Sequence, residues 1–151
     1  MLKTGDTAPD FSLLDQTGEK VTLSELLKAG PVVLFFYPKA MTTGCTKESC
    51  HFRDLAGEFA ELHAQRVGIS ADTVDKQAAF DSKHTLGYPL LSDPDRAVAA
   101  GFGVKRPGPI MNKRATFVIG ADRKILSAMS SELNMDLHAD EALTVLRSAA
   151  A

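Results

Sequence analysis

Tryptophan is absent from this sequence of 151 residues, and cysteine and tyrosine each occur only twice. Long hydrophobic runs are also missing: the longest, Val32 to Tyr37, is far shorter than the roughly 20 apolar residues that a membrane-spanning helix needs. The first residues, Met1 to Asp6, contain no apolar segment of the kind that secretory signals carry. We therefore expect a cytoplasmic protein that does not bind membranes.

An excess of charge of one sign is lacking as well. The 17 Lys and Arg residues and the 19 Asp and Glu residues give a net charge of −2 and are interspersed along the chain. Proteins that bind nucleic acids generally carry a basic patch or stripe, so we expect no nucleic-acid partner. Gly101 and Gly103 lack the third glycine of a dinucleotide-binding loop, because Arg106 occupies that position, and we expect no nucleotide cofactor.

The length is that of one domain, and we expect residues 1–151 to form a single domain. A chain of this size buries roughly 70% of its unfolded surface, so it needs neither a metal nor a disulfide for stability. Zinc sites favour a close Cys pair followed by a second Cys or His pair. Only His51 adjoins a cysteine here, so we expect no metal, and we expect all four histidines to be surface or capping residues.

Apolar patterns alternate between strand and helix along the chain. The run from Val32 to Tyr37 is typical of a strand buried on both faces, and a long amphipathic helix is predicted after it, over residues 43–64. This alternation predicts an α/β fold, with a central mixed sheet and helices on both faces. The other predicted segments are an N-terminal β-hairpin (11–14 and 20–23), strands at 67–70 and 89–91, helices at 74–83 (capped by Asp72 or Thr73), 94–100 and 137–147, and a second hairpin (115–119 and 124–129).

Cys45 lies in the first turn of the helix predicted at 43–64, directly after a turn that contains Pro38, Thr42 and Gly44. Unpaired backbone N–H groups and the positive end of the helix dipole favour an anion at such a position. The thiolate is the nucleophilic form of cysteine, and helix N-termini favour it. An inert core cysteine would not explain the polar groups beside it, so we predict that Cys45 is a reactive thiol.

Cys50 follows five residues later, which places it about 140° around an intact helix from Cys45. The two Cα atoms would then be roughly 8–9 Å apart, whereas a disulfide needs about 4.4–6.8 Å. Cys50 falls on the polar side of the predicted helix, together with Arg53 and Asp54. We therefore predict that the pair can form a disulfide only if the first turns of the helix unwind.

Pro38, Thr42 and Cys45 form the pattern P-x-x-x-T-x-x-C, which resembles the active-site motif of the peroxiredoxins. With Cys50 five residues further on, this stretch is similar to the bacterioferritin comigratory protein subfamily, also called the Q-type peroxiredoxins. The resemblance spans essentially the whole chain, with further matching stretches at 5–11, 68–70, 91–93 and 114–119.

The resemblance implies a thioredoxin-like fold and a thiol peroxidase that reduces hydrogen peroxide and organic hydroperoxides. Cys45 matches the peroxidatic cysteine, which becomes a sulfenic acid, and Cys50 matches the resolving cysteine, which closes an intramolecular disulfide. Thioredoxin or a similar dithiol protein would then be the reductant. Both thiols belong to one chain, so no intersubunit disulfide is needed and a monomer is expected.

Four further positions match catalytic residues of the family. Thr42 corresponds to the threonine whose hydroxyl contacts the thiolate and the peroxide, and Pro38 to the proline that shields the site from water. Arg114 corresponds to the arginine that stabilises the thiolate and the transition state, and Glu48 to a polar residue that orients this arginine. Thr43 departs from the pattern, because many members have proline there.

Two other functions remain open from the residues alone. A thiol–disulfide oxidoreductase acting on proteins would normally have C-x-x-C, and the spacing of Cys45 and Cys50 is longer. A metal- or partner-binding module with a similar core is the non-enzymatic alternative. We expect Lys105, Arg106 and Lys113 to lie on a solvated face.

Overall fold

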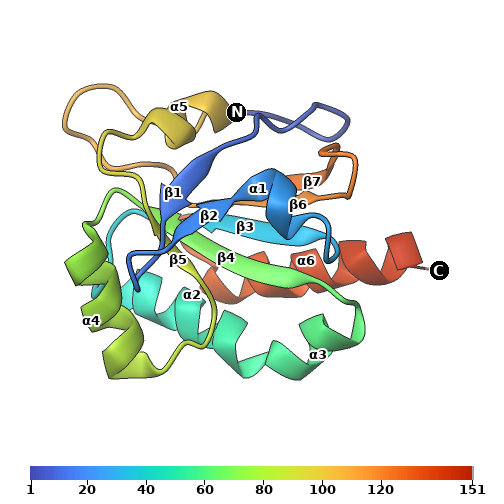
Figure 1. Cartoon of the computed structure of the whole chain (residues 1–151), viewed down its shortest axis with the longest axis horizontal. Coiled ribbons are helices and arrows are strands. Elements are labelled where there is room, and N and C mark those ends of the chain that lie inside the picture. Colours follow the sequence, from blue (N-terminus) through green and yellow to red (C-terminus); the bar gives the residue numbers. More distant parts are fainter. Residues whose placement is uncertain (151) are drawn as a thin grey trace.

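The computed structural model describes residues 1–150, whose strands all belong to one sheet (Figure 1). The strands are β1 (Ser12–Leu14), β2 (Lys20–Thr22), β3 (Val32–Phe36), β4 (Gln65–Ser70), β5 (Leu90–Ser92), β6 (Ala115–Ile119) and β7 (Ile125–Ser130). The helices are α1 (Leu23–Leu26), α2 (Thr43–Asp54), α3 (Ala56–Glu61), α4 (Val74–His84), α5 (Ala97–Phe102) and α6 (Met135–Ala150).

The sheet is mixed, and its strand order is β2-β1-β5-β4-β3-β6-β7. Strands β3, β4 and β5 form the centre of the sheet and run parallel to one another. Strand β6 runs antiparallel to β3, and β7 antiparallel to β6. The N-terminal hairpin β1–β2 extends the opposite edge by pairing antiparallel with β5. The predicted α/β architecture, including both hairpins, is therefore confirmed.

Two hydrophobic clusters cover the two faces of the sheet. Alternate residues of β3 belong to different clusters: Val33 and Phe35 point to one face, and Val32 and Leu34 to the other. Helices α2, α3, α4 and α6 pack on the first face, and α1 and α5 on the second (Figure 1). Both faces of β3 are buried, which explains its continuous apolar sequence.

The prediction of a single helix at 43–64 is wrong, because the helix is interrupted at Leu55, between α2 and α3. Leu55 has φ −95° and ψ 18°, outside the regular helix. The Nη1 of Arg66 donates to the carbonyl of Phe52 at 2.9 Å and so satisfies one of the last carbonyls of α2. Phe52 also stacks on Phe35, with ring centroids 4.2 Å apart. Contacts from the sheet therefore end this helix, without any glycine or proline at the break.

Other helix boundaries depend on side-chain caps. Thr73 caps α4 by accepting from the backbone N–H of Lys76, as predicted. The helix predicted at 94–100 instead begins at Ala97, because the carboxylate of Asp93 accepts from the N–H groups of Val98 and Ala99. Helix α1 had no counterpart among the predicted elements, since its four residues are too few to show a helical period.

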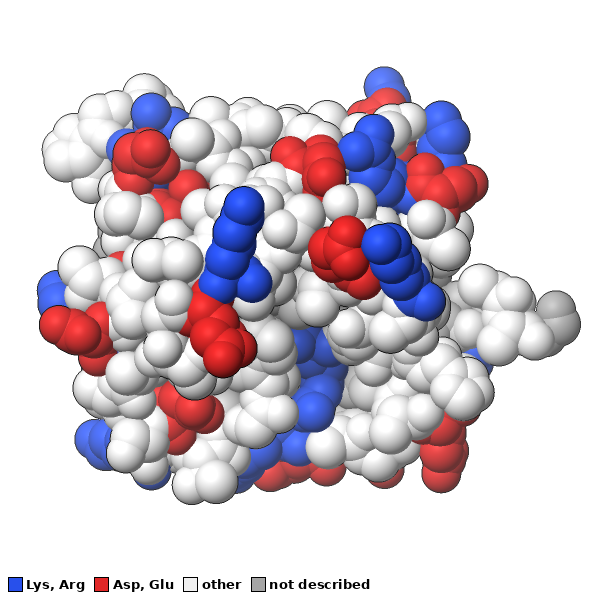
Figure 2. All heavy atoms as spheres, viewed as in Figure 1, with Lys and Arg blue, Asp and Glu red and all other residues white. Residues whose placement is uncertain are grey.

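The surface carries charges of both signs. Figure 2 shows Lys and Arg side chains scattered among Asp and Glu over one face, without a large patch of either sign. Within residues 1–150, no helix has the length and apolar character required to cross a bilayer.

Candidate active site

Strand pairing brings Cys45 and Arg114 together, although they are 69 residues apart in sequence. Phe36 at the end of β3 pairs with Ala115 at the start of β6, so Arg114 lies beside the point where the chain leaves β3 for α2. The Nη2 of Arg114 lies 3.3 Å from the Sγ of Cys45. Both side chains are buried, and Cys45 has no exposed surface. The guanidinium therefore donates directly to the sulfur within a buried environment.

Gly44, the residue before Cys45, leaves room for this contact. A Cβ atom at Gly44 would lie 3.3 Å from the Nη2 of Arg114 and 3.1 Å from the Cε of Met135. Both distances are tighter than ordinary van der Waals contacts, so a larger residue would displace the arginine or the methionine. The glycine therefore permits Arg114 to lie directly against the start of α2.

Glu48 lies one turn after Cys45 and contacts the same arginine. Its Oε1 accepts from the Nη1 of Arg114 at 2.8 Å, so one guanidinium contacts both the thiol and the carboxyl group. Glu48 has no exposed surface. Burial raises the pKa of Glu48 to about 8, although the charge and hydrogen bonds of Arg114 act in the opposite direction.

His138 of α6 lies behind Glu48, which makes the prediction of a surface histidine wrong. Its Nε2 lies 2.9 Å from the carbonyl of Ser131 and therefore donates to it, and its Nδ1 lies 2.7 Å from the hydroxyl of Thr116. Burial lowers the pKa of His138, which favours the neutral ring with an acceptor at Nδ1. The Nδ1 lies 3.4 Å from the Oε2 of Glu48, which makes no hydrogen bond within the described residues.

The main chain at Arg114 is fixed by neighbouring polar groups. Its N–H donates to the Oε1 of Glu132 at 3.0 Å, and its carbonyl accepts from the hydroxyl of Ser130 at 3.0 Å. Arg106 forms an ion pair with the same Glu132 oxygen at 2.8 Å, and this pair lies on the solvated face that the sequence predicted for Arg106. The Nε of Arg114 is buried and finds no acceptor among residues 1–150.

The loop between β3 and α2 carries Pro38 and Thr42. Asp72 accepts from the backbone N–H of Ala40 at 2.7 Å, which ties this loop to the end of β4. Thr42 is exposed, and its hydroxyl donates to the carbonyl of Lys39 at 2.8 Å. Pro38 is half-buried. The loop thus places Pro38 and Thr42 just before Cys45, and among residues 1–150 the Thr42 hydroxyl forms a hydrogen bond only with the loop itself.

The sequence predicted Cys50 on the solvent face of α2, and this prediction is wrong. It is half-buried and packs against the hydrophobic cluster that contains Cys45 and Phe52. Both cysteines are free thiols on one continuous helix. The geometry of an ideal helix separates their Cα atoms by roughly 8–9 Å, so the two thiols are not placed to form a disulfide.

Comparison with known proteins agrees with this fold. The chain matches the profile of the AhpC/TSA family over residues 4–128 and belongs to that family. The crystal structure of peroxidoxin BcpB from Mycobacterium tuberculosis superposes with a TM-score of 0.95 at 61% identity, covering 98% of each chain. Peroxiredoxin Bcp of Escherichia coli (strain K12) is 43% identical over 130 residues, which cover 82% of this chain and 83% of that protein.

A third relative is the bacterioferritin comigratory protein of Xanthomonas campestris, which has alkyl peroxide reduction activity. It is 28% identical, with a TM-score of 0.87 and coverage of 93% and 92% of the two chains. These similarities place the chain in the bacterioferritin comigratory protein, or Q-type, branch of the peroxiredoxins, which have a thioredoxin-like fold. The protein is an enzyme with peroxidase activity.

Proposed function

We propose that this enzyme reduces hydrogen peroxide and organic hydroperoxides with Cys45 as the peroxidatic residue. The contact between Arg114 and the Sγ of Cys45, at 3.3 Å in a buried site, carries this proposal. The Cys45 thiolate attacks one peroxide oxygen, the O–O bond breaks, and the leaving hydroxide or alkoxide takes a proton to become water or an alcohol. Cys45 is left as a sulfenic acid. The alkyl peroxide activity named for the Xanthomonas relative supports organic substrates.

The other four residues shape this reaction. Arg114 donates to the thiolate, and its unpaired Nε is a further donor for the oxygen on which charge develops. Glu48 accepts from the Nη1 of Arg114 and so orients the guanidinium, which leaves Nη2 for the sulfur. Thr42 reaches the peroxide when its hydroxyl turns from the Lys39 carbonyl, and Pro38 limits the access of water.

Cys50 is the proposed resolving residue. Its thiol attacks the sulfenic sulfur of Cys45, releases water and closes an intramolecular disulfide. Since the two Cα atoms are roughly 8–9 Å apart on an intact helix, α2 must unwind for this step. A dithiol protein such as thioredoxin then reduces the disulfide. Because both thiols come from one chain, the enzyme can complete its cycle as a monomer, in the cytoplasm where such reductants occur.

A stoichiometric experiment tests the proposal. One equivalent of hydrogen peroxide is added to the reduced protein, followed by thiol counting and intact mass spectrometry. We expect rapid loss of both thiols and a monomeric product two mass units lighter, with its disulfide between Cys45 and Cys50. Cys45→Ser should abolish peroxide consumption, whereas Cys50→Ser should still consume one equivalent and accumulate sulfenic acid. Survival of both thiols in the unmodified protein would overturn the proposal.

A further inference from the structure

Helix α2 is poorly suited to be helical by itself. Its sequence, TGCTKESCHFRD, includes five Thr, Ser or Cys residues and a glycine, which have low helix propensity. Thr42 at the N-cap makes no capping hydrogen bond through its side chain. Ser49 is fully buried, and its hydroxyl has no partner among the described residues. An unpaired buried polar group is costly, so contacts from outside the helix must hold this turn in place.

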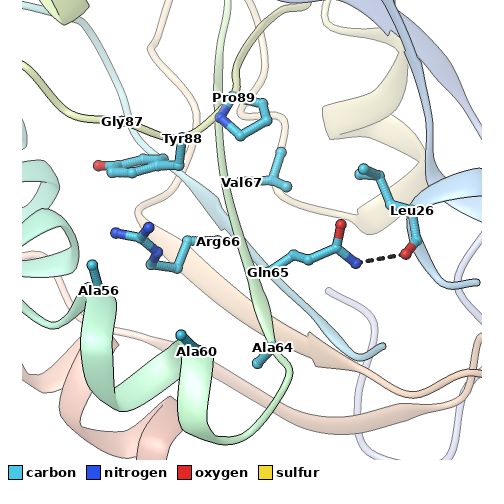
Figure 3. A pocket seen from close by; sticks show the side chains of 10 residues that line it. All are labelled: Leu26, Ala56, Ala60, Ala64, Gln65, Arg66, Val67, Gly87, Tyr88 and Pro89. Carbon is cyan, nitrogen blue, oxygen red and sulfur yellow. Dashed lines mark hydrogen bonds between the residues drawn. The ribbon is translucent and has the colours of Figure 1, made fainter. Parts of the chain in front are cut away.

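Tyr88, which precedes β5, supplies such a contact. Its hydroxyl donates to the carbonyl of Ser49 at 2.7 Å within a buried environment. Arg66 lies over the Tyr88 ring, with its guanidinium carbon 5.0 Å from the ring centroid, and also donates to the Phe52 carbonyl. Figure 3 shows Arg66 and the Tyr88 ring stacked on one side of a pocket, with Ala56 and Ala60 of α3 facing them.

The acceptor of this hydrogen bond lies directly before the second cysteine. The Ser49 carbonyl belongs to the peptide group that joins Ser49 to Cys50. Cys50 must turn about 140° around the helix axis to face Cys45, so this peptide group must leave its helical orientation. Burial raises the pKa of the Tyr88 hydroxyl well above its ordinary value, so it remains a donor at any physiological pH.

We propose that Tyr88 is a positioning residue, whose hydrogen bond to Ser49 holds Cys50 away from Cys45 and must break before the disulfide can form. The inference rests on the proposed function, because it concerns the resolution step of that cycle. Tyr88 thereby slows resolution and prolongs the folded form of α2, in which Arg114 contacts Cys45. Arg66 supports this role by fixing the ring of Tyr88 and the last turn of α2.

The chain provides a matched control for the test. It has only two tyrosines, both are buried, and both donate from their hydroxyl group. Tyr37 donates to the side chain of Gln77, which belongs to α4 and not to α2. Tyr88→Phe and Tyr37→Phe therefore remove the same chemical group, once at α2 and once elsewhere in the core.

Rapid-quench measurements on both variants separate the formation of the sulfenic acid from the formation of the disulfide. Reduced protein is mixed with hydrogen peroxide, alkylated at intervals and analysed by intact mass for sulfenic acid and disulfide. For Tyr88→Phe we expect disulfide formation to accelerate about fivefold, the typical effect of one hydrogen bond of about 1 kcal/mol. We expect sulfenic acid formation to stay unchanged, and less sulfinic acid to appear in excess peroxide. Tyr37→Phe should match the unmodified protein in all three measurements.

An unchanged rate of disulfide formation in Tyr88→Phe would overturn the inference, as would an equal acceleration in Tyr37→Phe. Failure of the proposed function would look different, because sulfenic acid would then not form or would persist in every variant.

A second measurement does not require Tyr88→Phe to fold. In Tyr37→Phe, Tyr88 is the only tyrosine of a chain without tryptophan, so the tyrosine absorption band comes from Tyr88 alone. Oxidation to the disulfide should shift the tyrosine band as the hydroxyl loses the Ser49 carbonyl. A tyrosine band that is identical in the reduced and disulfide forms would overturn the inference.

Discussion

Glu48 and Cys45 contact the same guanidinium. Arg114 donates to both groups, so an ionised Glu48 competes with the sulfur for its positive charge. The Nδ1 of His138 already accepts from the Thr116 hydroxyl, so Glu48 gains no hydrogen bond from this ring, and burial raises the pKa of Glu48 to about 8 and so favours its protonated form at neutral pH. At neutral pH the charge of Arg114 is then available mainly to Cys45.

The pH dependence of Glu48→Gln tests this arrangement. Burial raises the pKa of Glu48 to about 8, so the carboxyl group becomes charged as the pH rises through this value. We expect the second-order rate constant with hydrogen peroxide to fall above pH 8 in the unmodified protein. Glu48→Gln keeps a neutral acceptor for Arg114 and should lack this alkaline decline. Parallel profiles of the two proteins would contradict the assignment.

Stability should follow the same ionisation. The pKa of Glu48 is raised in the folded state above its ordinary value of 4.5, so its contribution to stability is complete at low pH and is lost as the pH rises through about 8. Thermal unfolding should therefore show the unmodified protein losing stability relative to Glu48→Gln as the pH rises from 4.5 to about 8.

Individual residues of the site were predictable to different degrees. Cys45 stands out because a turn with Pro, Thr and Gly precedes a helix start, and this pattern is local. Arg114 had no local signal, and only the family resemblance pointed to it, because the pairing of β3 with β6 brings it to Cys45. The burial of His138 was not predicted. Its signal was its spacing of four residues from Ala142, which lies on the buried face of α6.

At the scale of elements, the loop between β3 and α2 depends on a contact from the end of β4. Asp72 accepts from the N–H of Ala40 at 2.7 Å and from the hydroxyl of Ser70 at 2.6 Å. Met41 in the same loop has a φ of 70°, which a residue with a side chain rarely adopts. The surrounding contacts must therefore compensate for this conformation.

Asp72→Ala should both destabilise the fold and slow peroxide reduction. It leaves the Ala40 N–H without its acceptor, which costs about 1–3 kcal/mol. Chemical denaturation measures this loss, and single-turnover kinetics with hydrogen peroxide measures the effect on Cys45. Asp54→Ala is the matched control: its carboxylate pairs with Arg53 on the surface, and we expect a change within about 0.5 kcal/mol. Equal stability of the two variants would show that Asp72 does not hold the loop.

Elements were predicted best where the pattern is continuous and least well where tertiary contacts decide. The segment 115–119 forms β6 with the expected bounds, since all its residues are buried. The break between α2 and α3 follows from Arg66, which reaches the Phe52 carbonyl from β4, and no local pattern reveals it. The short helix α1 likewise depends on docking of Leu23 into the core.

At the scale of the whole molecule, the disulfide should lower stability. A bridge between residues 45 and 50 closes a very short loop, so it constrains the unfolded chain little. Forming it removes the first turns of α2 from the core, including the buried Cys45 and the contact with Arg114. We expect calorimetry to show a melting temperature on the order of 5 °C lower for the oxidised than for the reduced protein. The far-ultraviolet circular dichroism should lose helical signal at the same time.

A higher melting temperature on oxidation would contradict this expectation and would indicate that α2 stays folded around the disulfide. The Cys50→Ser variant provides the control, because peroxide cannot produce the bridge in it. We also propose that residues 1–151 are one cooperative domain, and the same calorimetric scans should show a single transition for the reduced protein.

The complete burial of Cys45 has a consequence for the order of events in turnover. A hydroperoxide is small enough to enter a buried site after a shift of side chains, whereas a protein reductant needs the sulfur at the surface. In the proposed cycle, the two co-substrates then react with different conformations of α2 and do not compete for one binding site. Steady-state kinetics should accordingly follow a ping-pong scheme, in which excess reductant leaves the reaction with hydroperoxide uninhibited.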